Sequence, residues 1–298
     1  MSKNNKLIII IGPTASGKTS LALKLCQRFN GEIISADSRQ VYKEMNIATN
    51  KELNLPVKQH MVDIIEPGQV LTVAQYKRMA IDCIKSIQNK SKIPFLVGGT
   101  GLYIQSIADN LKIPKAKPNK ILRQRLESKS LAELQTMIKT LDPETSEVIE
   151  MKNKRRLIRA LEVKLLTGKS FASQKNKGKS LFDILQIGIE ISREKLYKRI
   201  NRRVLEMAES GLADEVENLA KQYDWSLPSM SSIGYKEIGQ YLKKEITIDK
   251  AFNLIQTHTR QYARRQIQWF KRDKRIKWIA DYEQARKLVK KFLKEKRQ

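Results

Sequence analysis

Short apolar runs alternate with amphipathic segments along the first hundred residues. An isoleucine-rich run at 6–11 precedes a glycine-rich turn, and residues 18–29 then carry apolar side chains at helical spacing. Helical spacing returns at 73–88, and three further apolar runs of strand length cover 32–35, 60–65 and 94–97. Strands that alternate with helices form a parallel sheet, which binds ligands at the carboxyl ends of its strands. The pattern therefore predicts an α/β fold.

This pattern changes near residue 115. Prolines mark the entry to a stretch without strand signals, whose periodicity predicts basic amphipathic helices at 119–128, 130–141 and 153–167. Alternation at 181–191 indicates a return to the sheet, and the remainder is mostly helical with a late strand at 275–279. We therefore expect three parts: the first part of the core in 1–115, a helical insertion in 116–180, and the completion of the core with C-terminal helices in 181–298.

Composition narrows the class of protein. The chain has 298 residues, of which 41% are hydrophobic, so it can bury a substantial core. Its 58 Lys and Arg against 31 Asp and Glu give a net charge of +27, which attracts phosphate-rich polymers and makes nucleic acid the first partner to consider. A lysine-rich composition without any such partner is the alternative.

Two cysteines, Cys26 and Cys83, supply neither a disulfide framework nor a metal quartet. No apolar run approaches the roughly 20 residues of a membrane span, so we expect a cytoplasmic protein.

The glycine-rich turn carries the clearest chemical signal. It matches the phosphate-loop pattern of a glycine, four residues and then Gly-Lys-Thr, and it lies between a predicted strand and a predicted helix. Backbone N–H groups at a helix N-terminus attract a diphosphate or triphosphate, a lysine adds a full charge, and the threonine hydroxyl can hold Mg²⁺. The sequence predicts a P-loop NTPase-like sheet with a phosphate site made by Gly12, Pro13, Thr14, Ala15, Ser16, Gly17, Lys18 and Thr19.

An acidic residue should join this phosphate site. The strand at 94–97 ends in Gly98-Gly99-Thr100 rather than in the carboxylate of a motor ATPase, which argues against ATP hydrolysis. Asp37 follows the second predicted strand and so lies at the same sheet edge as the phosphate loop, where it can act as a general base. An isolated Asp that caps a turn is the alternative. The glycine pair would let the backbone approach a ligand closely, and Thr100 could cap a helix or contact a phosphate.

Two basic helices suggest a nucleic-acid backbone as partner. Arg155 and Arg159 lie four residues apart on the insertion, and Arg260 and Arg264 do so near the aromatic residues of the C-terminal region. Either helix alone fits a solvated surface equally well. Together with the net charge, they favour RNA or DNA, with aromatic rings available to stack on unpaired bases.

Several motifs in this order resemble the bacterial tRNA dimethylallyltransferases of the IPP transferase family. The resemblance runs from about residue 6 to residue 278. It rests on the phosphate loop and on five further segments with the sequences ISADSRQVY at 34–42, LVGGTGLY at 96–103, RRLIRALEV at 155–163, IGYKE at 233–237 and RQYARRQIQWF at 260–270.

The resemblance implies an activity and a set of site residues. The phosphate loop would grip the diphosphate of dimethylallyl diphosphate, with Mg²⁺ at Thr19, and Asp37 would take a proton from N6 of the adenosine immediately 3′ of the anticodon. The adenine would leave its stack to enter the site. Catalytic roles would fall to Lys18, Thr19 and Asp37. Contacts to the tRNA anticodon stem-loop would come from Asp37, Ser38, Arg39, Gln40, Thr100, Arg123, Arg155, Arg156, Leu157, Ile158 and Arg159.

Two segments depart from the family pattern. An arginine that helps to bind the diphosphate is replaced by Ser231, and Lys236 or an arginine between 260 and 272 could supply the missing charge. The segment 47–52 also differs from the usual Gly-Thr-Ala-Lys-Pro.

Three other functions remain open on the sequence. A P-loop nucleoside or polynucleotide kinase would use Asp37 on a hydroxyl and Lys18 on ATP. A non-catalytic RNA-binding protein would keep only a vestigial phosphate loop. Enzymes that prenylate free adenine nucleotides share the loop and the base, but they need no large RNA-binding insertion. We expect a monomer, because no long apolar heptad repeat is present.

Overall fold

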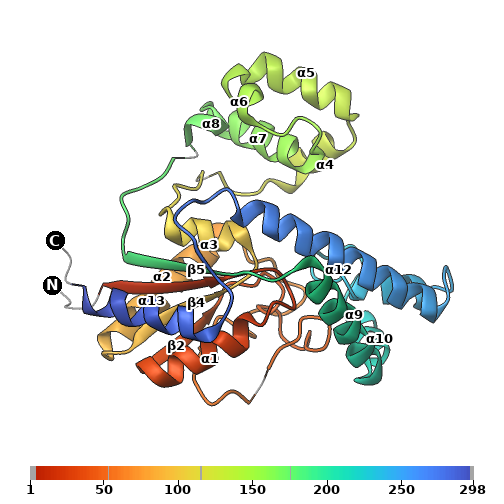
Figure 1. Cartoon of the computed structure of the whole chain (residues 1–298). Helices are drawn as coiled ribbons and strands as arrows, with labels where there is room; N and C mark the ends of the chain where they lie inside the picture. Colours follow the sequence, from red (N-terminus) through yellow and green to blue (C-terminus); the bar gives the residue numbers. More distant parts are fainter. Residues whose placement is uncertain (1–4, 53, 115, 175, 296–298) are drawn as a thin grey trace. The chain divides into compact units, whose positions relative to one another are not determined.

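The computed structural model describes residues 5–52, 54–114, 116–174 and 176–295, and its core is a six-stranded sheet (Figure 1). Every strand pairing in the sheet is parallel, and the strand order is β3-β2-β4-β1-β5-β6. The predicted α/β fold with a parallel sheet is confirmed. The strands are β1 (Lys6–Ile11), β2 (Gly31–Ser35), β3 (Gln59–His60), β4 (Ile93–Gly98), β5 (Asp183–Ile189) and β6 (Lys277–Ile279).

Helices cover both faces of this sheet (Figure 1). Ile8 and Ile10 of β1 are fully buried against α1 (Lys18–Phe29) and α13 (Tyr282–Lys294). The alternating residues of β1 point to the opposite face, where α2 (Val73–Asn89) and α3 (Gly101–Ala108) lie. Residues 7–11 are all completely buried, as expected for a central strand of a parallel sheet. The central strand therefore leads directly into the phosphate loop from a rigid position.

A second helical layer follows β5. It contains α9 (Arg193–Glu209), α10 (Leu212–Ala220), α11 (Tyr235–Leu242) and α12 (Ile248–Phe270). Their apolar faces enclose a core that also buries Val41, Tyr42 and Met45 from the segment after β2. This packing fixes α9 and α12 beside the loops that follow β1, β2 and β4.

The strand predicted at 60–65 is wrong beyond His60. Met61 and Asp63 adopt left-handed backbone angles, with φ of 63° and 53°, which no regular strand tolerates. The chain turns there, and Ile65 forms only an isolated bridge with Tyr42. Of this apolar run of strand length, only His60 therefore belongs to the sheet, where it ends β3.

Residues Ala108–Ser180 form a separate compact unit, which we call the insertion. The predicted boundary falls at residue 115, which lies outside the described residues. The insertion contains α4 (Lys120–Glu127), α5 (Leu131–Leu141), α6 (Pro143–Val148), α7 (Lys154–Thr167) and α8 (Phe171–Gln174) around its own apolar core. The short helices α6 and α8 were not predicted. The carboxylate of Asp142 caps α6 and Pro143 begins it, an arrangement that favours helix initiation.

None of the described helices has the length and apolar character needed to cross a membrane.

Candidate active site

The phosphate loop connects β1 to α1 through a tight turn. Gly17 has a φ of 92° and Ala15 one of 60°, so two left-handed residues shape the loop. The helix begins at Lys18 without a side-chain cap on its first amides. Uncapped N–H groups and the positive end of the helix dipole make this loop an anion site.

Lys18 lies inside the cavity formed by this loop. Its ammonium donates a hydrogen bond to the carbonyl of Pro13 at 2.7 Å. Burial lowers the pKa of Lys18 to about 8; Asp37 opposes this shift, and Arg203 adds to it. A cation held away from water in this way gains strongly from an anionic ligand.

The loops after β2 and β4 bring Asp37 to the same cavity. Thr100 accepts a hydrogen bond from the backbone N–H of Ser38 at 3.0 Å, which ties the two loops together. The Oδ1 atom of Asp37 accepts one from the N–H of Arg39 at 2.8 Å. Asp37 lines a cavity of about 500 Å³ together with Lys18 and Thr19. A carboxylate and the phosphate loop thus face one space.

Two arginines of α9, which the sequence analysis did not single out, complete this cavity. Arg199 donates to the carbonyl of Ser16 at 3.2 Å, and Arg203 donates to Oγ1 of Thr14 at 3.0 Å. Within the described part of the chain, the Nε of Arg203 and the Oγ of Ser16 are buried without a hydrogen-bond partner. Burial lowers the pKa of Arg203, and the Asp37 carboxylate acts against this shift. Ser16 lines neither cavity, whereas Arg203 lines the first one together with Lys18, so its unpartnered donor indicates a place for anionic oxygens.

A second cavity, of about 360 Å³, lies beside the first. The two cavities share Thr14, Asp37, Thr49, Arg203 and Tyr262 in their walls. The second one is partly apolar, because it is also lined by Ile200, Val204, Met207, Ile233 and Ile255. The shared wall puts Asp37 between an anion site and a space for a less polar group.

Tyr262 stands at the same junction. Burial raises the pKa of its phenol to about 12, while a hydrogen bond with Thr100 acts in the opposite direction. The phenol therefore stays neutral at physiological pH and can donate a hydrogen bond. Tyr262 is one of the C-terminal aromatic residues that the sequence suggested for stacking on unpaired bases, and its place between the two cavities was not predicted.

The glycine pair at the end of β4 packs closely against other parts of the protein. A Cβ at Gly98 would lie 2.2 Å from the carbonyl oxygen of Ala36, and one at Gly99 would lie 2.1 Å from the amide nitrogen of Gln266. Protein atoms therefore exclude a side chain at either position, while Gly98 still lines the first cavity, so access of a ligand to this backbone stays a prediction.

The missing cation at Ser231 has two candidate replacements at the cavities. Ser231 lines the second cavity, as does Arg265 from α12, and Arg203 lines both. Lys236 does not line either cavity and lies 3.8 Å from Glu237.

Magnesium fits the donors of the first cavity. The hydroxyl of Thr19 and the carboxylate of Asp37 are hard oxygen ligands, which Mg²⁺ prefers, and a bound diphosphate would add further oxygens. Among the described residues no group of three or more His, Cys, Asp or Glu could hold a metal on its own. Such a site therefore depends on the ligand for part of its coordination shell.

The insertion holds the second set of predicted residues, and their side chains differ in availability. The buried carboxylate of Glu162 binds Arg123 through two hydrogen bonds of 2.8 Å and also binds Arg159. Leu157 and Ile158 are buried in the insertion's core, so their side chains are not on its surface. The remaining pair, Arg155 and Arg156, is exposed, and Arg156 pairs with Glu150 at 3.0 Å.

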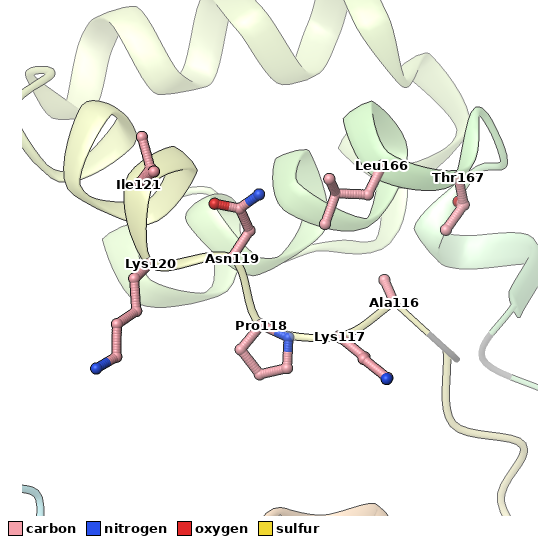
Figure 2. Close-up of a pocket in the computed structure, with 8 residues that line it drawn as sticks. All are labelled: Ala116, Lys117, Pro118, Asn119, Lys120, Ile121, Leu166 and Thr167. Atoms are coloured by element: carbon pink, nitrogen blue, oxygen red, sulfur yellow. The ribbon is translucent and has the colours of Figure 1, made fainter.

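A shallow pocket of about 670 Å³ opens on the insertion (Figure 2). It lies between the segment leading into α4 and the end of α7, where Leu166 and Thr167 form one wall. Figure 2 shows Lys117 and Lys120 extending from this segment toward the same side. The pocket thus combines an apolar wall with two cations.

Comparisons with known proteins agree with this arrangement. A family model described as IPP transferase matches residues 40–273. A tRNA dimethylallyltransferase of Microcystis aeruginosa is 44% identical over 92% of this chain and 87% of its own length, and one of Halothermothrix orenii is 42% identical over 97% and 93%. The crystal structure of a tRNA isopentenylpyrophosphate transferase from Bacillus halodurans superposes with a TM-score of 0.72 at 34% identity, covering 97% of this chain and 95% of that one. A eukaryotic dimethylallyltransferase acting on tRNA gives a TM-score of 0.79 at 28% identity, covering 97% and 77%.

Proposed function

This chain belongs to the IPP transferase family, and on that premise we propose that it transfers a dimethylallyl group from dimethylallyl diphosphate to tRNA. The acceptor is N6 of the adenosine immediately 3′ of the anticodon. One observation carries the proposal: Asp37 lies in the shared wall of an anion-binding cavity and a partly apolar cavity. A base between a leaving-group site and an acceptor site is what alkyl transfer to a weak nucleophile requires.

The donor's diphosphate fits the first cavity. The uncapped amides of the phosphate loop, the ammonium of Lys18 and the guanidinium of Arg203 all converge there. Negative charge on the leaving group grows as the allylic C–O bond breaks, so donors fixed at its position stabilise the transition state. Mg²⁺ held with the help of Thr19 would neutralise part of this charge. We also propose that Arg203 provides the cation that the family pattern places at Ser231.

Asp37 lies where the N6–C1 bond forms and where the N6 proton is removed. The N6 lone pair forms a bond to the allylic C1 while the C1–O bond breaks, and the diphosphate leaves with that electron pair. The N6 proton passes to the carboxylate of Asp37. One Asp37 oxygen is held by the Arg39 amide, so the carboxylate keeps a fixed orientation toward the cavity.

The acceptor reaches this point through the second cavity. Ser38 and Thr100 are linked at its edge, and Arg39 is fixed by a 2.7 Å hydrogen bond to the carbonyl of Pro228. Gln40 is bound by Ser35 at 2.9 Å, so it holds the loop as well as lining the first cavity. We propose that these four loop residues, 37–40, enclose the extruded adenine and that Tyr262 packs beside it.

Further contacts to the anticodon stem-loop come from the insertion. Arg155 and Arg156 offer exposed guanidinium groups, while Arg123 and Arg159 contribute the donors that Glu162 leaves open. The net charge of +27 adds long-range attraction for RNA. We further propose that the protein acts in the cytoplasm, since both cysteines are free thiols, as in a reducing compartment. We propose a monomer because the sequence has no long apolar heptad repeat.

A transfer assay tests the function. Purified protein, Mg²⁺ and radiolabelled dimethylallyl diphosphate are incubated with unmodified tRNA, with the same tRNA carrying guanosine after the anticodon, or with AMP. We expect label on the first tRNA alone. Label on AMP would assign the protein to nucleotide prenylation, and transfer of label from γ-labelled ATP to any acceptor would assign it to phosphoryl transfer.

A further inference from the structure

One face of α12 connects the two halves of the active site. Tyr262, Gln266 and Trp269 are spaced four and three residues apart, so they project from the same side of the helix. Tyr262 stands at the junction of the cavities, and a Cβ at Gly101 would lie 2.3 Å from the indole nitrogen of Trp269. This helix face therefore lies directly against the loop that follows β4.

Gln266 makes the central contact on this face. Its side-chain oxygen accepts a hydrogen bond from the N–H of Thr14 at 2.8 Å, and its nitrogen donates to the carbonyl of Gly99 at 2.9 Å. The residue is only 5% exposed. One amide thus links the phosphate loop to the loop after β4, with both polar atoms of its side chain engaged.

Each end of this link leads to a group with a role in the proposed reaction. The side chain of Thr14 holds Arg203, and so places the cation proposed for the diphosphate. Thr100, next to Gly99, holds the N–H of Ser38, the residue after the proposed base Asp37. The link therefore spans from the leaving-group side to the base side of the site.

We propose that Gln266 is a positioning residue that sets the distance between the phosphate loop and the Asp37 loop. It acts through Thr14 and Gly99 and takes no part in bond breaking. The proposal rests on the proposed function, because the distance matters only if a donor in the phosphate loop must be aligned with an acceptor at Asp37. Misplacement of reacting groups by about 1 Å can cost about 100-fold in rate.

Substitution of Gln266 separates this role from a merely structural one. Gln266→Met removes both hydrogen bonds at similar volume, and Gln266→Glu keeps an acceptor for Thr14 but loses the donor to Gly99. Gln88→Met is the matched control: Gln88 is also buried, and its amide donates to the carbonyl of Lys6 at 3.1 Å, at the far end of β1 from the phosphate loop. We expect kcat for tRNA prenylation to fall roughly 100-fold in Gln266→Met and at least tenfold in Gln266→Glu. The Kd for dimethylallyl diphosphate should change less than about threefold, because the amides of α1 and Lys18 stay in place and the hydrogen bond from Arg203 goes to the side chain of Thr14, which the substitution does not remove.

A double-mutant cycle gives the sharper readout. In an Asp37→Asn background the base is absent, so its alignment with the donor no longer matters. Adding Gln266→Met to this variant should lower kcat by less than about threefold. Additive effects, or a loss seen only in donor affinity, would overturn the proposal, as would kcat equal to that of Gln88→Met.

Hydrogen exchange tests the link without catalysis. The amide of Thr14 should lose protection in Gln266→Met and keep it in Gln88→Met; equal protection in both refutes the link. If the parent protein transfers no label to tRNA while the Thr14 amide behaves as expected, the proposed function fails and the link stands. If the parent is active and Gln266→Met is equally active, only the positioning role fails.

Discussion

Removing the buried carboxylate of Glu162 should loosen the insertion and leave the core unit intact. Glu162 is fully buried and accepts hydrogen bonds from the Arg123 guanidinium, from Arg159 and from the N–H of Asn119 at 2.8 Å. Burial acts to raise the pKa of Glu162, but these hydrogen bonds outweigh it, so the pKa lies below its ordinary value. We consider Glu162→Gln, which keeps the volume and removes the charge.

The expected loss of stability of the insertion follows from how deeply Glu162 and its two arginine partners are buried. Taking away one member of a buried ion pair costs about 3–5 kcal/mol. The side chains of Arg123 and Arg159 are 38% and 29% exposed, so water can rehydrate both in part, and the lower figure applies. A loss of about 3 kcal/mol corresponds to a roughly 150-fold increase in local opening.

The assay can address each unit separately. All three tryptophans, at 225, 269 and 278, lie outside the insertion, so their fluorescence reports unfolding of the core unit. Hydrogen exchange of α7 peptides reports the insertion. We expect exchange in α7 to accelerate roughly 150-fold, with little change in the tryptophan unfolding midpoint.

A matched control and the pH dependence complete this test. Glu194 pairs with Lys198 on α9, but both side chains are more than three-quarters exposed, so Glu194→Gln should cost less than about 0.5 kcal/mol. Because the folded pKa of Glu162 lies below the unfolded one, its contribution is present above pH 4.5 and is lost as pH falls below that value. The difference in α7 exchange rate between the parent protein and Glu162→Gln should therefore become smaller as the pH falls below 4.5. Exchange in α7 no faster than in Glu194→Gln at neutral pH would refute this reasoning.

Three further predictions concern the reaction. Asp37→Asn should lower kcat by about 10²–10⁴-fold in single-turnover assays while tRNA affinity stays within about threefold; full activity would exclude Asp37 as the base. Arg203→Met should raise the Kd for dimethylallyl diphosphate about 10–100-fold in calorimetry, since it removes a charged donor, whereas Lys198→Met on the exposed face of the same helix should leave it unchanged. Replacing Arg155 and Arg156 together by Ala should reduce the slope of log K for tRNA against log salt by about two; an unchanged slope would place RNA elsewhere.

Local patterns were sufficient to predict the sheet, with one exception. The run at 6–11 and the phosphate loop are local signals, and β1 and α1 have the predicted bounds. The run at 60–65 is also largely apolar, but Met61 and Asp63 take positive φ where the chain turns and the N–H groups of Asp63 and Ile64 bond to the loop after β2. Such backbone angles depend on tertiary packing, and hydrophobic periodicity does not report them.

In the candidate site, too, the residues next to local sequence signals were predicted, and those placed by tertiary packing were not. The loops that carry Lys18 and Asp37 follow predicted strands, so their common location could be inferred from the parallel sheet. Arg203 and Gln266 lie more than 180 residues further along the chain than the phosphate loop, and each looks like an ordinary residue of an amphipathic helix. The i, i+4 pair that Arg199 forms with Arg203 was the available signal, but solvated helix faces carry such pairs just as often.

The position of β1 in the sheet has a consequence for the order of folding. Strand β1 is flanked by β4, which is complete by residue 98, and by β5, which begins only at residue 183. During synthesis, the edge of β1 that pairs with β5 therefore stays unpaired until the whole insertion has left the ribosome. The insertion has its own apolar core, and its described elements are all helices, so it can fold during this delay. The active site, which needs α9 and α12 beside the phosphate loop, is assembled last.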